Sequence, residues 1–274
     1  MKYTLVTFSK MPDLDPDDRL LADELRLRGH TCNAAVWDDP AVDWSGAGTC
    51  VVRSTWDYHL KYDKFLSWVE TVGAQTKLWN PADLIKWNTN KTYLVELEKQ
   101  GAPITPTIVF DPSEKPPALP DWSELIVKPA VGLATHGVRR LKNQSAEYQE
   151  ILSGATATLL IQPYLQSVVD YGERALMFIG GKFSHAVQKA PFQILQAAGR
   201  AGEKPIEATP DEVAVASEIL KLIGTAHIYA RVDLVRDSNN KPVLLELELV
   251  EPSLFLAMHT PAAAAFADAL IGAN

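Results

Sequence analysis

The sequence lacks the features that mark several large functional classes. Its formal net charge of −8 leaves no basic excess of the kind that nucleic-acid-binding surfaces need, so we expect no nucleic-acid partner. No apolar run approaches the roughly 20 residues of a membrane-spanning helix. The opening residues, MKYTLVTFSKMPDLD, have neither the apolar core nor the cleavage site of a signal peptide. These absences predict a cytoplasmic protein with no membrane partner.

Cysteines and glycine-rich nucleotide motifs are equally scarce. The two cysteines, Cys32 and Cys50, each lie in a short apolar run, which favours two buried thiols over a disulfide. No G-x-G-x-x-G follows the first predicted strand, which disfavours a dinucleotide-binding oxidoreductase. The G-x-x-x-x-G-K-[ST] pattern of P-loop enzymes is missing as well. No Ser-His-Asp or Cys-His pattern suggests a protein nucleophile.

The composition that remains is that of an ordinary globular protein, 47% apolar and 22% charged. Short apolar strands alternate with amphipathic helices up to about residue 75, a pattern typical of an open parallel sheet. One of these helices is expected to end at Gly29. Later residues combine helices with hairpins, one of which turns at Gly180-Gly181. We therefore predict an α/β unit at residues 1–88, followed by two α+β units at 89–165 and 166–274.

A second hairpin, in the C-terminal unit, places charged residues inside apolar strands. If its turn comprises residues 238–241, Asp233 faces Glu246 and Arg231 faces Glu248 on one side of the sheet. Directly opposed carboxylates destabilise a sheet, so this pairing needs an explanation. The other side would carry the apolar side chains of both strands, namely Val232, Leu234, Leu245, Leu247 and Leu249.

A divalent cation between the carboxylates would explain this arrangement. Asp233, Glu246 and Glu248 supply the oxygen ligands that Mg²⁺ prefers and usually shares with phosphate and water. Arg231 beside them suits a phosphate oxygen, because its planar guanidinium matches that geometry. The alternative is a solvated strand face with scattered ion pairs, and a one-residue change in the turn would separate the charges.

Six segments of the chain occur together in a characteristic order: NKTY, IVKPAVGLATHGV, IQPYL, GERALMFIGGKFSHAVQK, ARVDLV and LLELELVEPS. Through them the chain resembles the ATP-grasp superfamily of ligases over roughly residues 80–260. It is most similar to the branch near glutathione synthetase and the ribosomal-protein glutamate ligases, and to the cycloserine-forming cyclases. The resemblance implies an α/β fold in which an N-terminal, open parallel-sheet (pre-grasp) domain precedes two α+β ATP-grasp subdomains that clasp ATP.

The resemblance also implies roles for individual residues. Lys91 and Lys128 would contact the nucleotide, and Lys128 and Arg231 would take part in catalysis. The family more often has Glu-x-Asn where this chain has Glu246-Leu247-Glu248, so the number of bound Mg²⁺ ions stays open. The predicted metal ligands are Asp233, Glu246 and Glu248. The predicted contacts to adenine and ribose are Gln162, Pro163, Tyr164, Leu165 and Glu173.

The loop AVGLATHG, between two predicted strands, is built from small residues. Such residues allow backbone amides to approach a triphosphate, and Gly132 and Thr135 are the candidate contacts. His136 in this loop and His185 further on lack metal-ligand spacing, and we interpret both as structural.

A polar stretch, RSTWDYH, follows a strand of the N-terminal unit, where ligands gather in open α/β sheets. In the family this domain helps to bind the carboxylate or acceptor substrate. The candidate substrate contacts are Arg53, Ser54, Thr55 and Asp57. The alternative is a strand-end turn that places Trp56 and Tyr58 in the core. Lys189 is a further candidate for the substrate or its transferred phosphate, against the alternative of a solvated surface lysine.

These observations predict an ATP-dependent carboxylate–amine ligase that forms an amide or peptide C–N bond through an acyl phosphate and releases ADP and phosphate. One alternative is an intramolecular cyclase of the cycloserine-forming type, and a second is a nucleotide-binding regulatory module without catalysis. The expected cofactors are ATP and Mg²⁺, and the expected partners are a small-molecule carboxylate and an amine. The identity of the substrates and the oligomeric state, for which a homodimer is one candidate, stay open.

Overall fold

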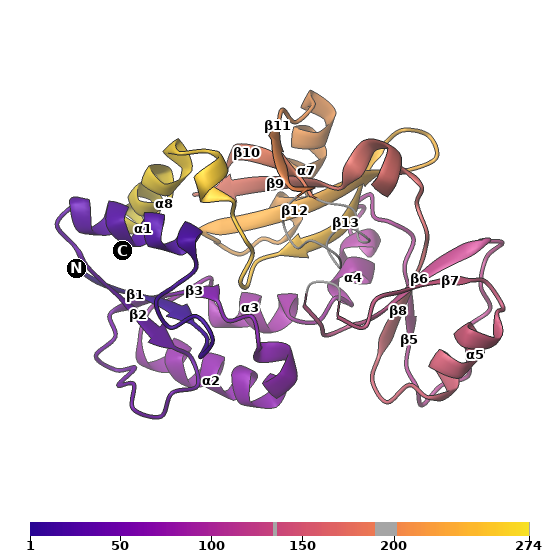
Figure 1. The fold of residues 1–274 in the computed structure, drawn as a ribbon, viewed down its shortest axis with the longest axis horizontal. Helices are drawn as coiled ribbons and strands as arrows, with labels where there is room; N and C mark the ends of the chain where they lie inside the picture. Colours follow the sequence, from indigo (N-terminus) through magenta and orange to yellow (C-terminus); the bar gives the residue numbers. More distant parts are fainter. Residues whose placement is uncertain (134–135, 190–201, 274) are drawn as a thin grey trace.

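The computed structural model describes residues 1–133, 136–189 and 202–273, which form three β-sheets with flanking helices. The parallel N-terminal sheet lies at the left of Figure 1, the small sheet at the right, and the large sheet between and above them. Among the described helices, none combines the length and the apolar character needed to span a membrane. The predicted α/β class, a parallel sheet followed by two α+β parts, is confirmed.

The N-terminal sheet has the strand order β2-β1-β3-β4, with every pair parallel. Its strands are β1 (Lys2–Thr7), β2 (Thr31–Val36), β3 (Thr49–Ser54) and β4 (Leu78–Trp79). The helices of this part are α1 (Pro16–Leu27), η1 (Tyr58–Lys61), α2 (Tyr62–Gln75) and α3 (Ala82–Asn88). Asp15 caps the N-terminus of α1, because its side chain accepts a hydrogen bond from the Asp17 amide, and Gly29 follows the end of the helix with a φ of 80°. Cys32 and Cys50 are both buried free thiols, as predicted.

The small sheet is antiparallel, with the order β5-β8-β6-β7. Its strands are β5 (Ile108–Phe110), β6 (Glu124–Pro129), β7 (Arg139–Lys142) and β8 (Leu159–Pro163). Helix α5 (Ala146–Ser153) covers this sheet and shares its core through Tyr148 and Leu152.

The large sheet is also antiparallel, with the order β11-β10-β9-β12-β13. Its strands are β9 (Arg174–Ile179), β10 (Lys182–Gln188), β11 (Lys204–Ile206), β12 (Tyr229–Arg236) and β13 (Pro242–Glu248). The helices around it are α4 (Tyr93–Lys99), the π-helical turn η2 (Val168–Gly172), α7 (Pro210–Leu222), η4 (Leu256–Met258) and α8 (Pro261–Gly272).

The hairpin of β12 and β13 pairs its charged residues as predicted, although its turn differs from the prediction. Arg231 lies opposite Glu248 and Asp233 lies opposite Glu246. The turn spans residues 237–241 rather than 238–241, and a β-bulge at Leu245 compensates for the extra residue. The prediction that Leu245 packs on the apolar face is therefore wrong: it is half-buried and lines a cavity, while Leu244 occupies the core.

The packing of the helices does not follow the predicted unit boundaries. Helix α8, at the C-terminal end, lies beside α1 (Figure 1) and shares a core with the N-terminal sheet and β9. Helix α4 packs against the large sheet, although the predicted boundary assigns it to the unit at 89–165. Asn80 joins the N-terminal part to the hairpin of β12 and β13 through its side-chain amide. The amide nitrogen donates to the carbonyl oxygens of Tyr229 at 3.0 Å and Leu249 at 2.7 Å, and the amide oxygen accepts from the Ile228 backbone N–H at 2.8 Å.

A buried ion pair fixes the same junction. The Arg53 Nε donates to Asp18 Oδ1 at 2.8 Å, and both side chains are almost fully buried, at 2% and 3% exposure. The Nη2 of Arg53 donates to the Pro252 carbonyl oxygen at 2.8 Å, and its guanidinium lies 5.0 Å from the centre of the Tyr229 ring. Arg53 therefore connects α1, β3 and the segment that follows β13.

We expect Arg53→Met to destabilise the protein by about 3–5 kcal/mol, because the variant leaves the Asp18 carboxylate buried without its partner. The measurement is the free energy of unfolding in urea. Arg26→Met is the control: Arg26 pairs with Asp23 on the exposed side of α1 and donates to the Cys32 carbonyl oxygen at 2.8 Å, so the loss should stay below about 2 kcal/mol. Adding Asp18→Asn to Arg53→Met should restore part of the stability. Equal, small losses for both arginines would contradict the buried-pair interpretation.

Candidate active site

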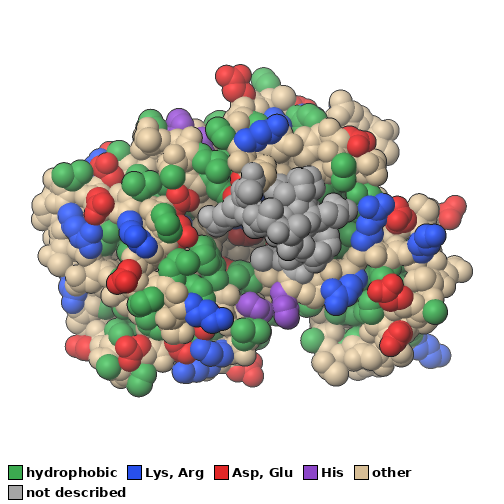
Figure 2. All heavy atoms as spheres, in the orientation of Figure 1, with side chains coloured by type: hydrophobic (Ala, Val, Ile, Leu, Met, Phe, Trp, Pro, Cys, Tyr) green, Lys and Arg blue, Asp and Glu red, His purple; other side chains and the backbone are tan. Residues whose placement is uncertain are grey.

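A cavity of about 480 Å³ lies where the three parts of the fold meet. Its wall includes Trp56 from the N-terminal part, strands β6 to β8 of the small sheet, and strands β12 and β13 of the large sheet. The face of the molecule drawn in Figure 2 carries lysine and arginine side chains mixed with acidic ones, and its described part has no continuous basic surface. The cavity has the size and enclosure of a small-molecule site.

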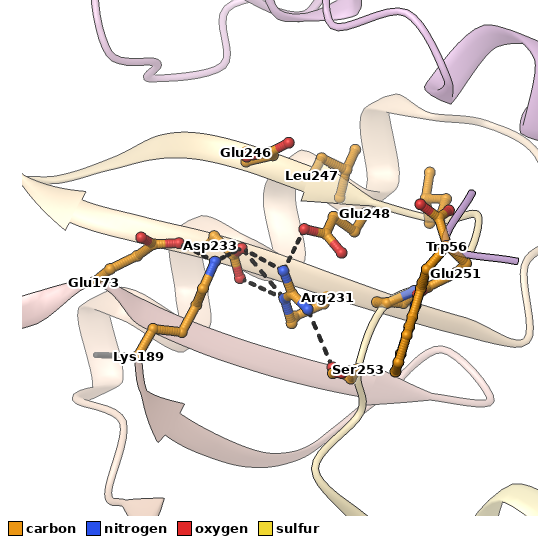
Figure 3. A network of polar contacts seen from close by, with 12 residues as sticks. Trp56, Glu173, Lys189, Arg231, Asp233, Glu246, Leu247, Glu248, Glu251 and Ser253 are labelled. Carbon is orange, nitrogen blue, oxygen red and sulfur yellow. Dashed lines mark hydrogen bonds and ion pairs between the residues drawn. The ribbon is translucent and has the colours of Figure 1, made fainter. Parts of the chain in front are cut away.

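One wall of the cavity is a network of buried charges on the large sheet (Figure 3). Arg231 donates to both carboxylate oxygens of Asp233 at 2.9 Å, to the Glu248 carboxylate, and to the Ser253 carbonyl oxygen at 3.2 Å. Lys189 Nζ donates to Glu173 at 2.5 Å and to Asp233 at 3.1 Å. The alternative of a solvated surface lysine at position 189 is therefore wrong.

These cations decide which carboxyl groups of the hairpin ionise. Burial alone would raise the pKa of Asp233, but the charges of Arg231 and Lys189 hold that pKa at about 2. Burial acts on Glu246 in the same way, and Lys91 and Lys128 hold its pKa at about 2. Both carboxylates are therefore ionised at neutral pH.

Glu248 and Glu251 behave differently. Burial raises the pKa of Glu248 to about 7 despite the nearby Arg231, with further contributions from Asp233 and Glu246. Burial and the charge of Glu248 raise the pKa of Glu251 to about 8. Both groups therefore take up protons near neutral pH, and they add less negative charge to the cavity than Asp233 and Glu246 do.

Two lysines lie on the opposite side of this charge. The Lys91 ammonium lies 3.1 Å from Glu246 and donates to the Gly132 carbonyl oxygen at 2.5 Å, so it ties the small-residue loop to β13. Lys128 extends from β6 and is 7% exposed, and burial lowers its pKa. Within the part of the chain that the structure describes, no carboxylate pairs with the Lys128 ammonium. A buried lysine without an anionic partner is suited to bind an anion.

The other end of the cavity is less polar. Its wall includes Ile126, Val138 and the bulged Leu245 together with the predicted hinge residues Gln162, Pro163, Tyr164 and Leu165. The Arg140 guanidinium lies 3.6 Å from the centre of the Tyr164 ring and pairs with Glu124. Gln162 Nε2 donates to Thr107 Oγ1 at 2.8 Å. A flat apolar end next to backbone groups is suited to an aromatic base.

The structure brings most of the predicted site residues to this cavity. Twelve of them line it: Lys91, Lys128, Gly132, Gln162, Pro163, Tyr164, Leu165, Glu173, Lys189, Arg231, Glu246 and Glu248. Asp233 is fully buried behind Arg231 and Lys189 and is not part of the cavity wall. The predicted contact Thr135 and the neighbouring Ala134 lie outside the described residues.

The polar stretch after β3 does not reach the cavity through its predicted members. Arg53 is held by Asp18, Ser54 Oγ donates to Thr7 Oγ1 at 3.0 Å, and Asp57 accepts from Trp37 Nε1 at 2.8 Å. Thr55 is fully buried beside them. These four residues have structural partners or positions in the N-terminal core, and the geometry gives no support to their predicted contact with substrate. From this stretch it is Trp56, which the alternative interpretation placed in the core, that lines the cavity.

The two histidines that we interpret as structural lie in different surroundings. His185 Nε2 lies 3.0 Å from the Leu254 carbonyl oxygen in the interior, which agrees with a structural role. His136 lines the cavity, with its ring 5.6 Å from that of His59.

Sequence reasoning missed the segment that follows β13. Glu251, Ser253 and Phe255 all line the cavity, and Glu251 is only 6% exposed. The signal was a third glutamate, after Glu246 and Glu248, at the end of the same apolar run. It lies beyond the strand, where alternation no longer predicts which way a side chain points.

The expected cluster of three metal ligands is not assembled in this structure. Across residues 1–133, 136–189 and 202–273, no three His, Cys, Asp or Glu side chains converge closely enough to hold a metal ion. Each hairpin carboxylate instead contacts an arginine or a lysine. Mg²⁺, however, is usually bound by one or two carboxylates together with substrate phosphates. Glu246 and Glu248, which reach the cavity wall, have the donor chemistry for that arrangement.

Comparison with known proteins shows a consistent likeness. Residues 3–80 match the N-terminal domain of D-cycloserine synthetase DcsG. The cycloserine biosynthesis protein DcsG of Streptomyces lavendulae is 32% identical over 289 residues, which cover 97% of this chain and 96% of that protein. The crystal structure of D-cycloserine synthetase DcsG matches with a TM-score of 0.88 at 30% identity, covering 100% of this chain and 99% of the other.

More distant structures share the fold. The ATP-grasp ligase PsnB, complexed with a minimal precursor, matches with a TM-score of 0.68 at 19% identity, covering 100% and 99% of the two chains. The D-alanine–D-alanine ligase of Bacillus anthracis matches with a TM-score of 0.66 at 13% identity, covering 99% and 95%. The predicted resemblance to ATP-grasp ligases is confirmed.

The raised pKa of Glu251 predicts a pH-dependent difference between the wild type and Glu251→Gln. A carboxyl group whose pKa is higher in the folded state stabilises the fold at low pH, and this stabilisation is lost as the pH rises from about 4.5 to about 8. Glutamine loses no proton, so the melting temperature of Glu251→Gln relative to wild type should rise across this window by about 2–4 °C or more. Scanning calorimetry at several pH values measures the difference.

Glu150→Gln is the control, because Glu150 is exposed on α5, far from the cavity. Its melting temperature should follow that of the wild type at every pH. If the difference between Glu251→Gln and wild type stayed constant from pH 5 to pH 8.5, Glu251 would not be the group that carries this dependence.

Proposed function

The chain belongs to the family of the cycloserine biosynthesis protein DcsG, within the ATP-grasp ligases that form carbon–nitrogen bonds, and on this basis we propose that it activates a substrate carboxylate as an acyl phosphate. The carboxylate oxygen attacks the γ-phosphorus of ATP, and the bond from that phosphorus to the bridging oxygen of ADP breaks. An amine nitrogen then attacks the acyl carbon, inorganic phosphate leaves, and the nitrogen gives up a proton.

The observation that carries this proposal is the set of buried cations at the cavity. Lys91, Lys128, Lys189 and Arg231 all line it, and Lys128 has no anionic partner among the described residues. A triphosphate would supply the missing negative charge. Charge-assisted hydrogen bonds from these groups would hold the phosphates and offset the charge that develops during transfer. A soluble protein gains nothing in stability from an unpaired buried lysine, so this arrangement favours a nucleotide site.

The remaining contacts of the nucleotide follow from the cavity wall. We assign the less polar end, with Gln162, Pro163, Tyr164 and Leu165, to the adenine ring, and Glu173 to the ribose side. The backbone at Gly132 would lie near the phosphates, and Thr135, which lies outside the described residues, stays a prediction from the sequence. This assignment keeps the predicted ATP contacts and adds Leu245 to the apolar wall.

Mg²⁺ would bind Glu246 and Glu248 together with the phosphates. When bound, Mg²⁺ neutralises negative charge on the phosphates while the γ-phosphoryl group is transferred. Asp233, the third predicted ligand, could reach a cation only if Arg231 and Lys189 turn away from it. In the ligand-free protein Asp233 instead orients these two cationic side chains toward the cavity.

Ring closure within one molecule is the variant that the likeness to D-cycloserine synthetase DcsG favours. The relative named D-cycloserine synthetase makes a cyclic product, and it matches the full length of this chain. A substrate with both reacting groups in one molecule also needs less room beside ATP than two separate substrates. Ligation of two molecules, as the name D-alanine–D-alanine ligase describes for a neighbour of the same fold, is the second candidate.

The direct test is ADP release by the purified chain with Mg-ATP and a panel of amino-acid derivatives, some with both a carboxylate and a tethered amine. Ring closure predicts that a single compound suffices for turnover and that no second amine increases the rate. Turnover only with paired compounds would establish the intermolecular reaction. A protein that binds no nucleotide would contradict the proposal as a whole.

Lys128→Ala should weaken Mg-ATP binding at least tenfold, the loss expected when one charge-assisted contact worth about 1.5–3 kcal/mol is removed. Isothermal titration calorimetry measures the affinity. Lys142→Ala is the matched control, because Lys142 is exposed on the neighbouring strand of the same sheet. Equal affinity in the Lys128 variant and the wild type would remove Lys128 from the nucleotide site.

Glu246→Gln should reduce turnover at least tenfold and abolish most of the thermal stabilisation that Mg-ATP gives the wild type, since a ligand stabilises only the state it binds. Because Glu246 also offsets the charge of Lys91, the ligand-free variant should be slightly less stable than the wild type. The measurements are ADP release and melting scans with and without Mg-ATP. Normal turnover of the variant at limiting Mg²⁺ would exclude Glu246 as a metal ligand.

A further inference from the structure

Strand β13, which carries Glu246 and Glu248, is the last strand of the large sheet and has a strand neighbour, β12, on one side only. Its other edge is nevertheless buried: Leu244 and Leu249 are fully buried, and Leu247 is 1% exposed. Backbone groups at a buried edge need hydrogen-bond partners, because an unsatisfied N–H or C=O group inside a protein is destabilising. The partners on this edge therefore determine how β13 is held.

The first part of this edge pairs with backbone. The Leu244 N–H donates to the Pro103 carbonyl oxygen, and the Thr105 N–H donates to the Leu244 carbonyl oxygen, both at 2.8 Å. These bonds flank a single parallel bridge between Leu244 and Ile104. Among the described residues, no strand continues the pairing on this side beyond the bulge at Leu245. The backbone groups that follow the bulge therefore need other partners.

Side chains take the place of a strand along the rest of the edge. The Tyr93 hydroxyl donates to the Leu247 carbonyl oxygen and accepts from the Leu247 N–H, both at 2.8 Å. Asn88 Nδ2 donates to the same carbonyl oxygen at 2.9 Å, and Asn88 Oδ1 accepts from the Leu249 N–H at 2.7 Å. The Leu249 carbonyl oxygen accepts from Asn80 Nδ2 at 2.7 Å. The backbone N–H and C=O groups of Leu247 and Leu249 are thus all held by side chains.

These contacts also act on the glutamates that alternate with the leucines. Figure 3 shows Glu246, Leu247 and Glu248 in succession along β13. Successive side chains of a strand point to opposite faces, so fixing the backbone of Leu247 also fixes the directions of Glu246 and Glu248. Lys91, which pairs with Glu246, lies in the same short segment as the side chains that hold the strand, residues 88–93. One segment therefore restrains both the backbone and a carboxylate of β13.

We propose that Asn88 and Tyr93 are positioning residues for Mg²⁺ binding. They hold the backbone of Leu247 so that the carboxylates on both sides of it, those of Glu246 and Glu248, reach the same cation. Outer partners that orient metal ligands in this way raise the affinity for the metal. Neither Asn88 nor Tyr93 lines the 480 Å³ cavity, so each acts through the strand and not by contact with the nucleotide. The inference rests on the proposed function, which assigns the two carboxylates to Mg²⁺.

The test measures how ADP binding depends on Mg²⁺, by calorimetry at a series of Mg²⁺ concentrations. Tyr93→Phe keeps the ring and removes both contacts with Leu247. The Mg²⁺ concentration that gives half of the maximal gain in ADP affinity should rise about tenfold. The affinity for ADP without Mg²⁺ should stay close to that of the wild type. Asn88→Ala, which removes the contacts of Asn88 with the same strand, should shift the Mg²⁺ dependence in the same direction.

Two controls separate positioning from a general loss of stability. Tyr148→Phe makes the same chemical change at a buried tyrosine of α5 whose hydroxyl has no hydrogen-bond partner among the described residues. Thr4→Val removes a buried hydrogen bond to the Ala47 carbonyl oxygen, at 2.7 Å, in the N-terminal sheet. Thr4→Val should lower the melting temperature by a few degrees, as Tyr93→Phe does, because each variant leaves a buried backbone group without a partner. Both controls should keep the Mg²⁺ dependence of the wild type.

An unchanged Mg²⁺ dependence in Tyr93→Phe would overturn the proposal. The same shift in Thr4→Val would also overturn it, because loss of stability would then explain the effect. An equal loss of ADP affinity with and without Mg²⁺ would assign Tyr93 to the nucleotide instead. ADP binding by the wild type that does not depend on Mg²⁺ would show that the two carboxylates hold no cation, and the proposal would fail with that assignment.

One further outcome distinguishes this proposal from the proposed function. The wild type could show the Mg²⁺ dependence, and Tyr93→Phe the expected shift, while no substrate leads to the release of ADP from ATP. That result would contradict the ligase activity and still support the positioning role of Tyr93.

Discussion

The contact of Arg231 with Asp233 and Glu248 is the interaction on which the rest of the site depends. Because Arg231 contacts both carboxylates, β12 and β13 can carry Asp233 and Glu248 close together in a buried place. Without the arginine, charge repulsion and the loss of solvation would destabilise this arrangement. Lys189 and Lys91 complete the neutralisation. These cations are also the groups that a triphosphate would attract. We infer that the partners of these groups change when nucleotide and metal bind. The phosphates would then accept hydrogen bonds from the arginine and lysine side chains, and Mg²⁺ would bind the carboxylates that those side chains release.

Sequence reasoning found this hairpin because strand alternation and turn position are local properties. It placed Arg231 opposite Glu248 and Asp233 opposite Glu246 correctly, although it assumed a turn that is one residue too short. A β-bulge restored the register, and no residue pattern distinguishes a bulge at Leu245 from a regular strand. For this reason one side chain, that of Leu245, was predicted on the wrong face of the sheet. The parallel N-terminal part was predictable from the alternation of strands and helices, which is also a local pattern.

Long-range partners were beyond such reasoning. The position of Arg53 at a strand end suggested a ligand contact, but its actual partner, Asp18, lies 35 residues earlier in the chain and is buried with it. Nothing in the stretch RSTWDYH indicates that pairing. Glu251 was missed for a different reason: no lysine or arginine of the described chain pairs with its carboxylate, and it lies where strand periodicity has ended. Sequence patterns predict well on which face of a strand or helix a side chain lies. They predict poorly what surrounds the side chain of a loop residue.

The segment at residues 251–253 links the N-terminal part to the charge network at the cavity. Its three carbonyl oxygens are held by Trp56, Arg53 and Arg231, so one short stretch of backbone is shared by the N-terminal core and the phosphate-side network. Bond formation between a carboxylate and an amine requires the reacting groups to be held at a defined separation. A backbone fixed at both ends can impose that separation without a direct contact between Arg53 and substrate. The buried pair of Arg53 and Asp18 therefore helps to fix the geometry of this segment beside the cavity.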